Sequence, residues 1–175
     1  MSATPTTGSQ TIGPYWHLLE EPEWADLTRF GATGEVITLT GTIRDGDGAL
    51  VTDACVEIWQ ASPPASDVFQ GWGRARTDSD GRFSFRTLKP GPVPGRGNAL
   101  QAPHIAITIL ARGILIAIHT RAYFAGEKQN ELDPLLTMIE EPARRSTLIA
   151  EPTTPGVWNL DIRLQGEGET VFLDI

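Results

Sequence analysis

The chain contains 175 residues, of which 40% are hydrophobic and 21% are charged, and its formal net charge is −8. This length suits one domain with a well-buried core and is short for two domains of ordinary size. The negative charge argues against a nucleic-acid partner, because the basic residues are scattered and Arg144 and Arg145 are their only adjacent pair. No stretch approaches the roughly 18 apolar residues that a membrane-spanning helix requires.

Cys55 is the only cysteine, so an intrachain disulfide is impossible. Because Cys55 lies within an apolar strand pattern, we expect it to be a buried structural thiol. The first ten residues are small and polar and predict an extended arm. They have neither the basic start nor the apolar run of a secretory signal, so a cytoplasmic location is expected.

Alternation of apolar and polar residues predicts a series of β-strands after Gly34. In chain order, the predicted strands cover residues 37–43, 54–60, 82–88, 103–110, 115–124 and 158–164, and residues 171–175 end the chain. The turn signal Asp-Gly-Asp-Gly at residues 45–48 follows the first strand. The positions expected to face the core are Ile37, Leu39, Gly41, Ile43, Ala54, Val56, Ile58, Phe83, Phe85, Ile105, Ile107, Ile109, Ile116, Ile118, Thr120, Ala122 and Phe124.

Helices are expected to be few and short. Residues 23–30 predict one or two helical turns, and Pro142 divides the longer candidate over residues 132–149 into two pieces. Short strands punctuated by Gly and Pro indicate an all-β fold, a β-sandwich with short helices and long loops. The loops over residues 61–73 and 89–102 are rich in Pro and Gly, and loops of this length are often functional.

Four segments, in order along the chain, resemble motifs of the intradiol ring-cleavage dioxygenases. They are Thr11-Ile12-Gly13-Pro14-Tyr15, Val56-Glu57-Ile58-Trp59-Gln60-Ala61, residues 78–106 and residues 160–166. Each motif is weak by itself, whereas their common order and spacing is specific. The resemblance covers nearly the whole chain after the arm and implies the aromatic-ring-dioxygenase sandwich, which is transthyretin-like.

Catalytic members of that family hold ferric iron with two tyrosinates and two histidines, which suit a hard metal ion. Where the family has Gly-Pro-Tyr-Pro and His-Ile-His, this chain reads Gly-Pro-Val93-Pro and His104-Ile-Ala106. The loop over residues 62–72, where the family has its other tyrosine, contains none. Only His104 remains of four ligands, so the resemblance implies no metal in this chain. His104 is then either a displaced ligand of another metal site or, as we expect, a hydrogen-bonded residue at a strand end.

The chain resembles more closely the iron-free chain of those family members that are built from two homologous chains. This closer resemblance lies in residues 102–107, 111–114, 118–124 and 165–172. It implies a homologous beta chain that binds Fe(3+), an aromatic carboxylate substrate, dioxygen and a higher hetero-oligomer. The implied reaction is intradiol cleavage of 3,4-dihydroxybenzoate to 3-carboxy-cis,cis-muconate, in the beta-ketoadipate route. This chain is expected to be inactive alone. Residues 1–34 are expected to contact the partner, and residues 35–175 to form the sandwich.

Arg121 is the strongest candidate for binding substrate. Its strand has apolar residues at even positions, so His119, Arg121 and Tyr123 are predicted to face away from the domain's own core. The planar guanidinium matches a carboxylate through two hydrogen bonds. The family resemblance places this arginine at the active-site entrance, where it assists binding of the substrate carboxylate. The competing interpretation is a structural ion pair, for example with Glu127.

The segment containing Thr11, Gly13, Pro14 and Tyr15 also has two interpretations. Its Gly-Pro step restricts the backbone and could simply start the fold. The resemblance instead implies that these residues shape the partner's iron pocket and exclude water from it, which we favour. We expect this segment and Arg121 to lie outside the vestigial metal positions Val93, His104 and Ala106. His17 is expected to be exposed or at an interface.

Two other functions remain open. The chain could be a free-standing, non-catalytic module that binds small molecules on a transthyretin-like sandwich. It could also be a self-sufficient enzyme that uses another metal, which the ligand count makes least favoured.

Overall fold

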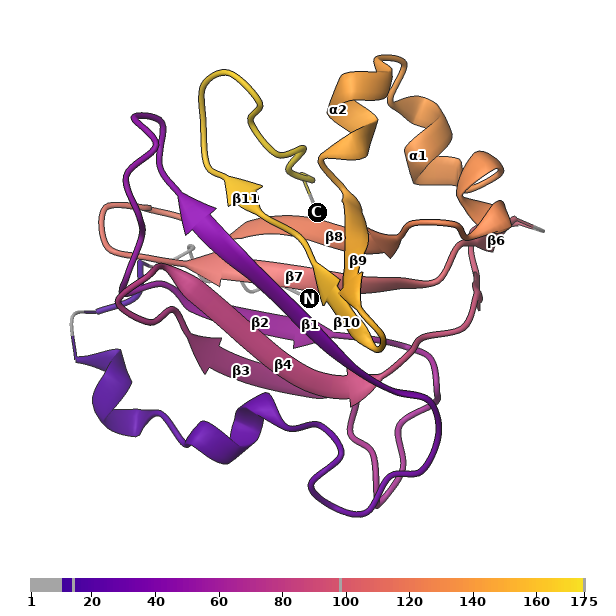
Figure 1. Cartoon of the computed structure of the whole chain (residues 1–175), viewed down its shortest axis with the longest axis horizontal. Helices are drawn as coiled ribbons and strands as arrows, with labels where there is room; N and C mark the ends of the chain where they lie inside the picture. The colour runs from indigo at the N-terminus through magenta and orange to yellow at the C-terminus, as the bar shows by residue number, and fades with distance from the viewer. Residues whose placement is uncertain (1–10, 14, 98, 175) are drawn as a thin grey trace, which may run out of the picture.

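Two layers of strands, in which burial alternates along the chain, make up the fold (Figure 1). The computed structural model describes residues 11–13, 15–97 and 99–174, so the predicted arm and Pro14 lie outside the described residues. The strands are β1 (Val36–Arg44), β2 (Cys55–Trp59), β3 (Trp72–Arg76), β4 (Arg82–Leu88), β5 (Val93–Pro94), β6 (Leu100–Gln101), β7 (His104–Leu110), β8 (Ile118–Phe124), β9 (Ile149–Thr154), β10 (Val157–Asn159) and β11 (Ile162–Arg163). The helical segments are the 3-10 turns η1 (Trp16–Leu19), η2 (Pro22–Ala25) and η3 (Lys128–Glu131) and the helices α1 (Pro134–Met138) and α2 (Pro142–Ser146).

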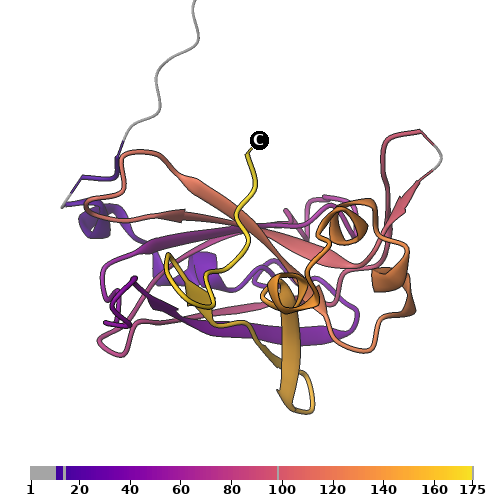
Figure 2. The same cartoon turned by 90° about the horizontal axis from the view of Figure 1, so that it is seen from above.

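Hydrogen bonds connect the strands of both layers into one nine-stranded sheet. One layer contains β4, β1, β10 and β9, with β1 antiparallel to β4 and parallel to β10 and β11. The other contains β8, β7, β2 and β3, which are all antiparallel neighbours. The short parallel pairing of β8 with β9 joins the layers along one edge. Figure 2 shows the two layers from the side, with the hairpin of β5 and β6 projecting beyond them.

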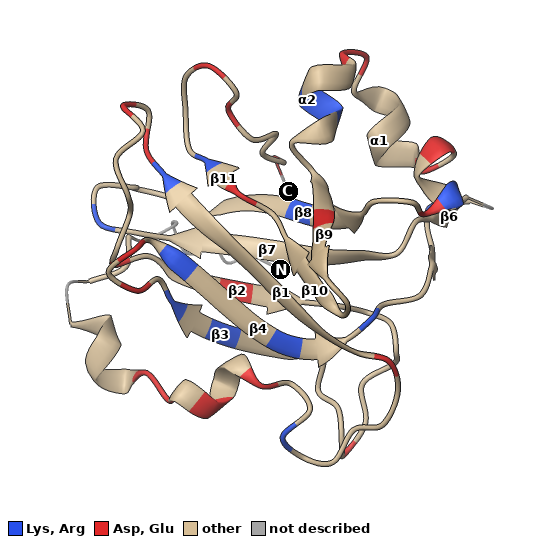
Figure 3. Ribbon diagram, viewed as in Figure 1, with Lys and Arg blue, Asp and Glu red and all other residues tan. Residues whose placement is uncertain are grey.

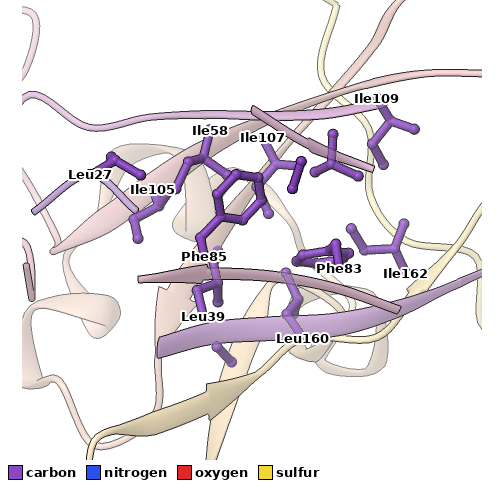
Figure 4. Close-up of a cluster of buried hydrophobic side chains, with 14 of the residues drawn as sticks. Leu27, Leu39, Ile58, Phe83, Phe85, Ile105, Ile107, Ile109, Leu160 and Ile162 are labelled. Atoms are coloured by element: carbon purple, nitrogen blue, oxygen red, sulfur yellow. The ribbon is translucent and has the colours of Figure 1, made fainter. Parts of the chain in front are cut away.

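The main core lies between these layers (Figure 4). Phe83 and Phe85 extend from β4, with ring centroids 6.1 Å apart, toward the isoleucines of β7 on the opposite layer. Burial confirms every predicted core position on β1, β2, β4 and β7 that carries a hydrophobic side chain. The sandwich predicted from alternation is therefore confirmed.

Gly41 is required where β1 passes close to the turn between β10 and β11. A Cβ atom built on Gly41 would lie 1.9 Å from the backbone oxygen of Leu160 and 2.7 Å from the ring of Phe83. Any larger residue would therefore push β1 away from its neighbours. The glycine in this apolar pattern marks a close backbone approach.

The predicted strand over residues 115–124 begins only at Ile118. Residues before it form a turn with Gly113 at a φ of +82°, and Ile116 is 58% exposed, so its predicted place in the core is wrong. The strand predicted over residues 158–164 is divided into β10 and β11, which pair with different parts of β1. The helical candidate over residues 132–149 forms two pieces as predicted, but Ile149 begins β9.

Four further segments differ from the prediction or refine it. The helical candidate over residues 23–30 contains only the η2 turn. β3 was missed because its two inward positions are Gly73 and Ala75, which give little hydrophobic signal. The loop over residues 89–102 contains the β5–β6 hairpin, and residues 171–174 make only an isolated bridge, between Leu173 and His119.

The segment with η1 and η2 lies along the edge formed by β3 and β4. Trp24 packs on Trp72 with ring centroids 5.8 Å apart, and Asp26 pairs with Arg86 at 3.4 Å. Figure 3 shows acidic residues of this segment beside basic residues of the neighbouring strands. Exposed ion pairs of this kind contribute little. The aromatic contact and Leu27, which is buried in the main core, therefore hold the segment in place.

Cys55 is buried in β2, as predicted. Burial raises the pKa of its thiol to about 12 and so keeps it protonated and unreactive at neutral pH. Within the described residues, no helix has the length and apolar character needed to cross a bilayer.

Replacing Phe85 by Ala should lower the free energy of unfolding by about 3–5 kcal/mol, because a fully buried ring is removed from a close-packed core. Denaturant unfolding followed by fluorescence measures this change. Phe30→Ala is the matched control, since that ring is 47% exposed, and it should cost less than about 1 kcal/mol. Equal losses in the two variants would contradict this description of the core.

Candidate functional site

The vestigial metal positions lie on the outer side of the β7–β8 pair. β7 turns its isoleucines inward, so His104 and Ala106 face outward. In the antiparallel register His104 is opposite Tyr123 and Ala106 is opposite Arg121, and Val93 of β5 is opposite Gln101 of β6. Residues opposite one another share a face, which brings these positions into one neighbourhood.

Arg121 is the central side chain of this neighbourhood. Its Nη1 donates hydrogen bonds to Oε1 of Gln101 at 2.7 Å and to the hydroxyl of Tyr123 at 3.2 Å. Within residues 11–13, 15–97 and 99–174, no acidic side chain forms an ion pair with it. Glu127, the suggested structural partner, instead pairs with Lys89. The expectation that Arg121 lies outside the vestigial positions is wrong, because the register places it opposite Ala106.

Tyr123 faces away from the main core, as predicted, but it is fully buried in a second cluster with Ala102, Leu136 and Leu148. The helices α1 and α2 follow β8 in the chain, and the residues around them cover this part of its outer face. Its hydroxyl donates to Oδ1 of Asp133 at 3.1 Å. Burial raises the pKa of the phenol well above its ordinary value, so it remains a hydrogen-bond donor.

Asp133 is a buried carboxylate with an unusually complete set of donors. Its Oδ1 also accepts from the backbone N–H groups of Leu135 and Leu136, at 2.9 and 3.1 Å, and its Oδ2 accepts from the N–H of Ala102 at 2.8 Å. It caps α1 through the first two bonds and fixes the segment before β7 through the third. Such bonds compensate for removing the charge from water.

His104 is held at the start of β7. Its Nδ1 lies 2.8 Å from the carbonyl oxygen of Ala102, so Nδ1 carries a proton and donates. Its ring lies against Tyr123, with centroids 5.4 Å apart. The expected strand-end, hydrogen-bonded histidine is therefore what the structure shows. Burial lowers the pKa of His104 below its ordinary value of 6.5.

The residues at the vestigial positions do not fit a ferric ion. Val93 and Ala106 offer no donor atom, and His104 supplies at most Nε2, because Nδ1 is bonded to the backbone. Throughout the described part of the chain, no three His, Cys, Asp or Glu side chains cluster in a way that could hold a metal. The arrangement is suited to binding an anion through Arg121.

A pocket of about 620 Å³ opens beside Arg121. It lies between the β5–β6 hairpin, α1 and the last described residues, and it is lined by Gly95, Arg96, Ala99, Gln101, Arg121, Pro134, Leu135, Met138, Ile139, Leu173 and Asp174. The polar part of this lining consists of Arg96, Arg121, the amide of Gln101 and the carboxylate of Asp174. Two arginines against one carboxylate leave the lining positive, which suits a largely apolar ligand that carries a carboxylate.

The residues predicted near the N-terminus lie elsewhere. Oγ1 of Thr11 is 3.5 Å from the carbonyl oxygen of Ala111, just past the end of β7, and Tyr15 is exposed. Ala111 is five residues from Ala106, which corresponds to about 17 Å along an extended strand. Within this chain, the structure therefore does not bring Thr11, Gly13 and Tyr15 together with Arg121. His17 is exposed, as predicted.

Sequence reasoning missed Gln101, Asp133 and the apolar residues of α1. Asp133 could have been recognised, because Asp before Pro is a common start of a helix. Gln101 gives no such signal, since only the β5–β6 hairpin brings it to Arg121.

The lowered pKa of His104 predicts a pH-dependent contribution to stability. The unfolded chain binds this proton more readily than the folded chain, so the free energy of unfolding should fall as pH drops below about 6.5. Denaturant titrations at pH 7.5, 6.5 and 5.5 on the parent and on His104→Gln measure the difference. His17→Gln controls for the loss of an exposed imidazole. If the difference in free energy of unfolding between the parent and His104→Gln stays constant across this pH range, the prediction is contradicted.

Comparison with known proteins agrees with the fold and the motifs. A family profile described as "Dioxygenase" matches residues 13–156. The protocatechuate 3,4-dioxygenase alpha chain of Pseudomonas putida is 41% identical over 194 residues, covering 97% of this chain and 96% of that protein. The protocatechuate 3,4-dioxygenase beta chain of Burkholderia cepacia is 31% identical, covering 80% of this chain and 65% of its own length.

A solved structure shows the same architecture. The dioxygenase domain of a dioxygenase and carbohydrate-binding fusion protein from Streptomyces sp. SirexAA-E aligns with a TM-score of 0.64 and 28% identity. The alignment covers 93% of this chain and 99% of that one. Together with the family match, these similarities show that the chain belongs to the intradiol ring-cleavage dioxygenase family.

Proposed function

We propose that this chain is the alpha subunit of a protocatechuate 3,4-dioxygenase and that it works with a homologous, iron-bearing beta subunit. The reaction is cleavage of 3,4-dihydroxybenzoate by dioxygen, between its two hydroxylated carbons, to 3-carboxy-cis,cis-muconate. The main support for the proposal is the replacement of metal-binding residues at the vestigial positions. Val93 and Ala106 replace ligands there, and Arg121, with Gln101 beside it, occupies their neighbourhood.

In this function the iron belongs to the beta subunit, and this chain supplies binding and shape. Arg121 is the group that receives the substrate carboxylate, because a guanidinium can form two parallel hydrogen bonds with it. Carboxylate binding of this kind favours 3,4-dihydroxybenzoate over catechol, which lacks the charge. No redox step takes place on residues of this chain.

The N-terminal region, residues 1–34, is the second contact with the partner in this proposal. Tyr15, Leu18 and Leu19 are between 72% and 75% exposed, and a partner chain would cover that apolar surface. Thr11, Gly13, Pro14 and Tyr15 would then line the beta subunit's pocket. Because Thr11 and Arg121 lie near opposite ends of β7, the contact with partner subunits would have to extend along the whole strand. A higher hetero-oligomer in the cytoplasm completes the proposal.

A second candidate function is small-molecule binding by this chain alone. It is supported by the pocket of about 620 Å³ beside Arg121, whose lining combines two arginines with apolar residues of α1. A free-standing module would bind an aromatic carboxylate there without any partner. Assembly with a beta chain separates the two functions.

Production of this chain with and without an iron-bearing homologue from the same genome tests the assembly. The homologue is recognised by intact Gly-Pro-Tyr-Pro and His-Ile-His motifs. The chain alone should lack the visible absorption of tyrosinate bound to ferric iron, because its vestigial positions offer a single nitrogen donor. The co-purified complex should show that absorption and ring cleavage. Stoichiometric iron in the isolated chain, or failure of the two chains to associate, would overturn the proposal.

An Arg121→Ala chain, assembled with its partner, should lose about 10- to 100-fold in kcat/KM for 3,4-dihydroxybenzoate, since hydrogen bonds between charged groups contribute about 1.5–3 kcal/mol. Any activity with catechol should change little. Arg82→Ala, which removes an exposed arginine from the other layer, is the matched control. Unchanged kinetics with the carboxylated substrate would refute the role of Arg121.

A further inference from the structure

The hydrogen bonds of Arg121 use only one of its three nitrogens. Nη1 is bonded to Gln101 and Tyr123, whereas Nε and Nη2 have no hydrogen-bond partner among the described residues. Arg121 is only partly buried and lines the pocket described above. The edge formed by Nε and Nη2 is the one that pairs with a carboxylate through two parallel bonds.

Both groups that hold Arg121 are neutral. Gln101 contributes an amide oxygen and Tyr123 a phenol oxygen, so neither cancels the charge of the guanidinium. The same hydrogen-bond network contains the carboxylate of Asp133, which is connected to Arg121 only through the hydroxyl of Tyr123. It is already bonded to three backbone N–H groups and to the phenol. Asp174 lines the same pocket but forms no ion pair with Arg121. Among the described residues, Arg121 is therefore oriented without being neutralised by a salt bridge.

The anchors are themselves fixed by the fold. Tyr123 is buried, packs against His104 and donates to Asp133, which leaves its oxygen lone pairs directed to Arg121. Gln101 belongs to the β5–β6 hairpin, and its Nε2 donates to the carbonyl oxygen of Pro94 at 3.2 Å. This second bond orients the amide so that its oxygen faces Arg121.

We propose that Gln101, Tyr123 and Asp133 are positioning residues that present the Nε–Nη2 edge of Arg121, with its charge intact, to the carboxylate of the substrate. This inference rests on the proposed function of Arg121. It adds that the neutrality of the anchors is as important as their geometry. An acidic anchor would hold the guanidinium equally well and would compete with the ligand.

The test uses the assembled enzyme and the variants Gln101→Glu, Gln101→Leu and Tyr123→Phe. Substrate dissociation constants are measured without dioxygen, and KM and kcat with it. Gln101→Glu should raise the dissociation constant and KM for 3,4-dihydroxybenzoate by roughly tenfold or more, although it keeps the hydrogen bond. Gln101→Leu and Tyr123→Phe should each raise them about three- to tenfold, the usual effect of losing one such hydrogen bond. Values of kcat should change much less.

Binding of catechol and the same substitutions in an Arg121→Ala background are the controls. The substitutions should leave catechol affinity unchanged, because catechol lacks the carboxylate. In the Arg121→Ala background they should leave the affinity for 3,4-dihydroxybenzoate unchanged, because the guanidinium is missing. A Gln101→Glu enzyme with unchanged affinity for 3,4-dihydroxybenzoate, or equal losses with and without Arg121, would overturn the inference while leaving the role of Arg121 intact. No effect of Arg121→Ala itself would overturn both. Gln101 is only partly buried, so its variants test the idea even where Tyr123→Phe fails to fold.

Discussion

The alternation of β7 is the constraint on which the rest of the site depends. Three isoleucines at odd positions enter the core, and their burial fixes which residues of this strand face outward. Antiparallel pairing with β8 then decides that Ala106 meets Arg121 and His104 meets Tyr123. A shift of the register by one residue would bury the arginine and expose the isoleucines. The burial that stabilises the sandwich therefore also sets the positions of the candidate site residues.

The outer face of β8 has a buried part and a part that lines the pocket. Its buried end, at Tyr123, packs under the helical region and is tied to Asp133, whereas Arg121, two residues earlier, reaches the pocket. Asp133 connects this arrangement to the start of α1 and to the backbone before β7. One buried carboxylate thus links the helix, the strand and the arginine. The vestigial positions accordingly lie beside a network of polar contacts that is part of the fold.

The sequence predicted the sandwich well because most of its strands alternate strongly. It failed where that signal is weak or misleading. β3 has only Gly73 and Ala75 facing the core, and Ile116 is apolar but lies in a turn. At the site, counting ligands at Val93, His104 and Ala106 required only the sequence. The partners of Arg121 could not be found in that way, because Gln101 is 20 residues distant and reaches it through a hairpin.

By itself, the sequence determined the family, the class of fold and the lack of a complete ligand set, because each depends on residue identity and local period. Tertiary structure alone decided that Arg121 lies among the vestigial positions, that Tyr123 is buried and that Thr11 is at the far end of β7. These facts depend on register and on how α1 and the β5–β6 hairpin pack over the sheet. Contacts between segments far apart in the chain leave little trace in local patterns, which is the physical reason for the division.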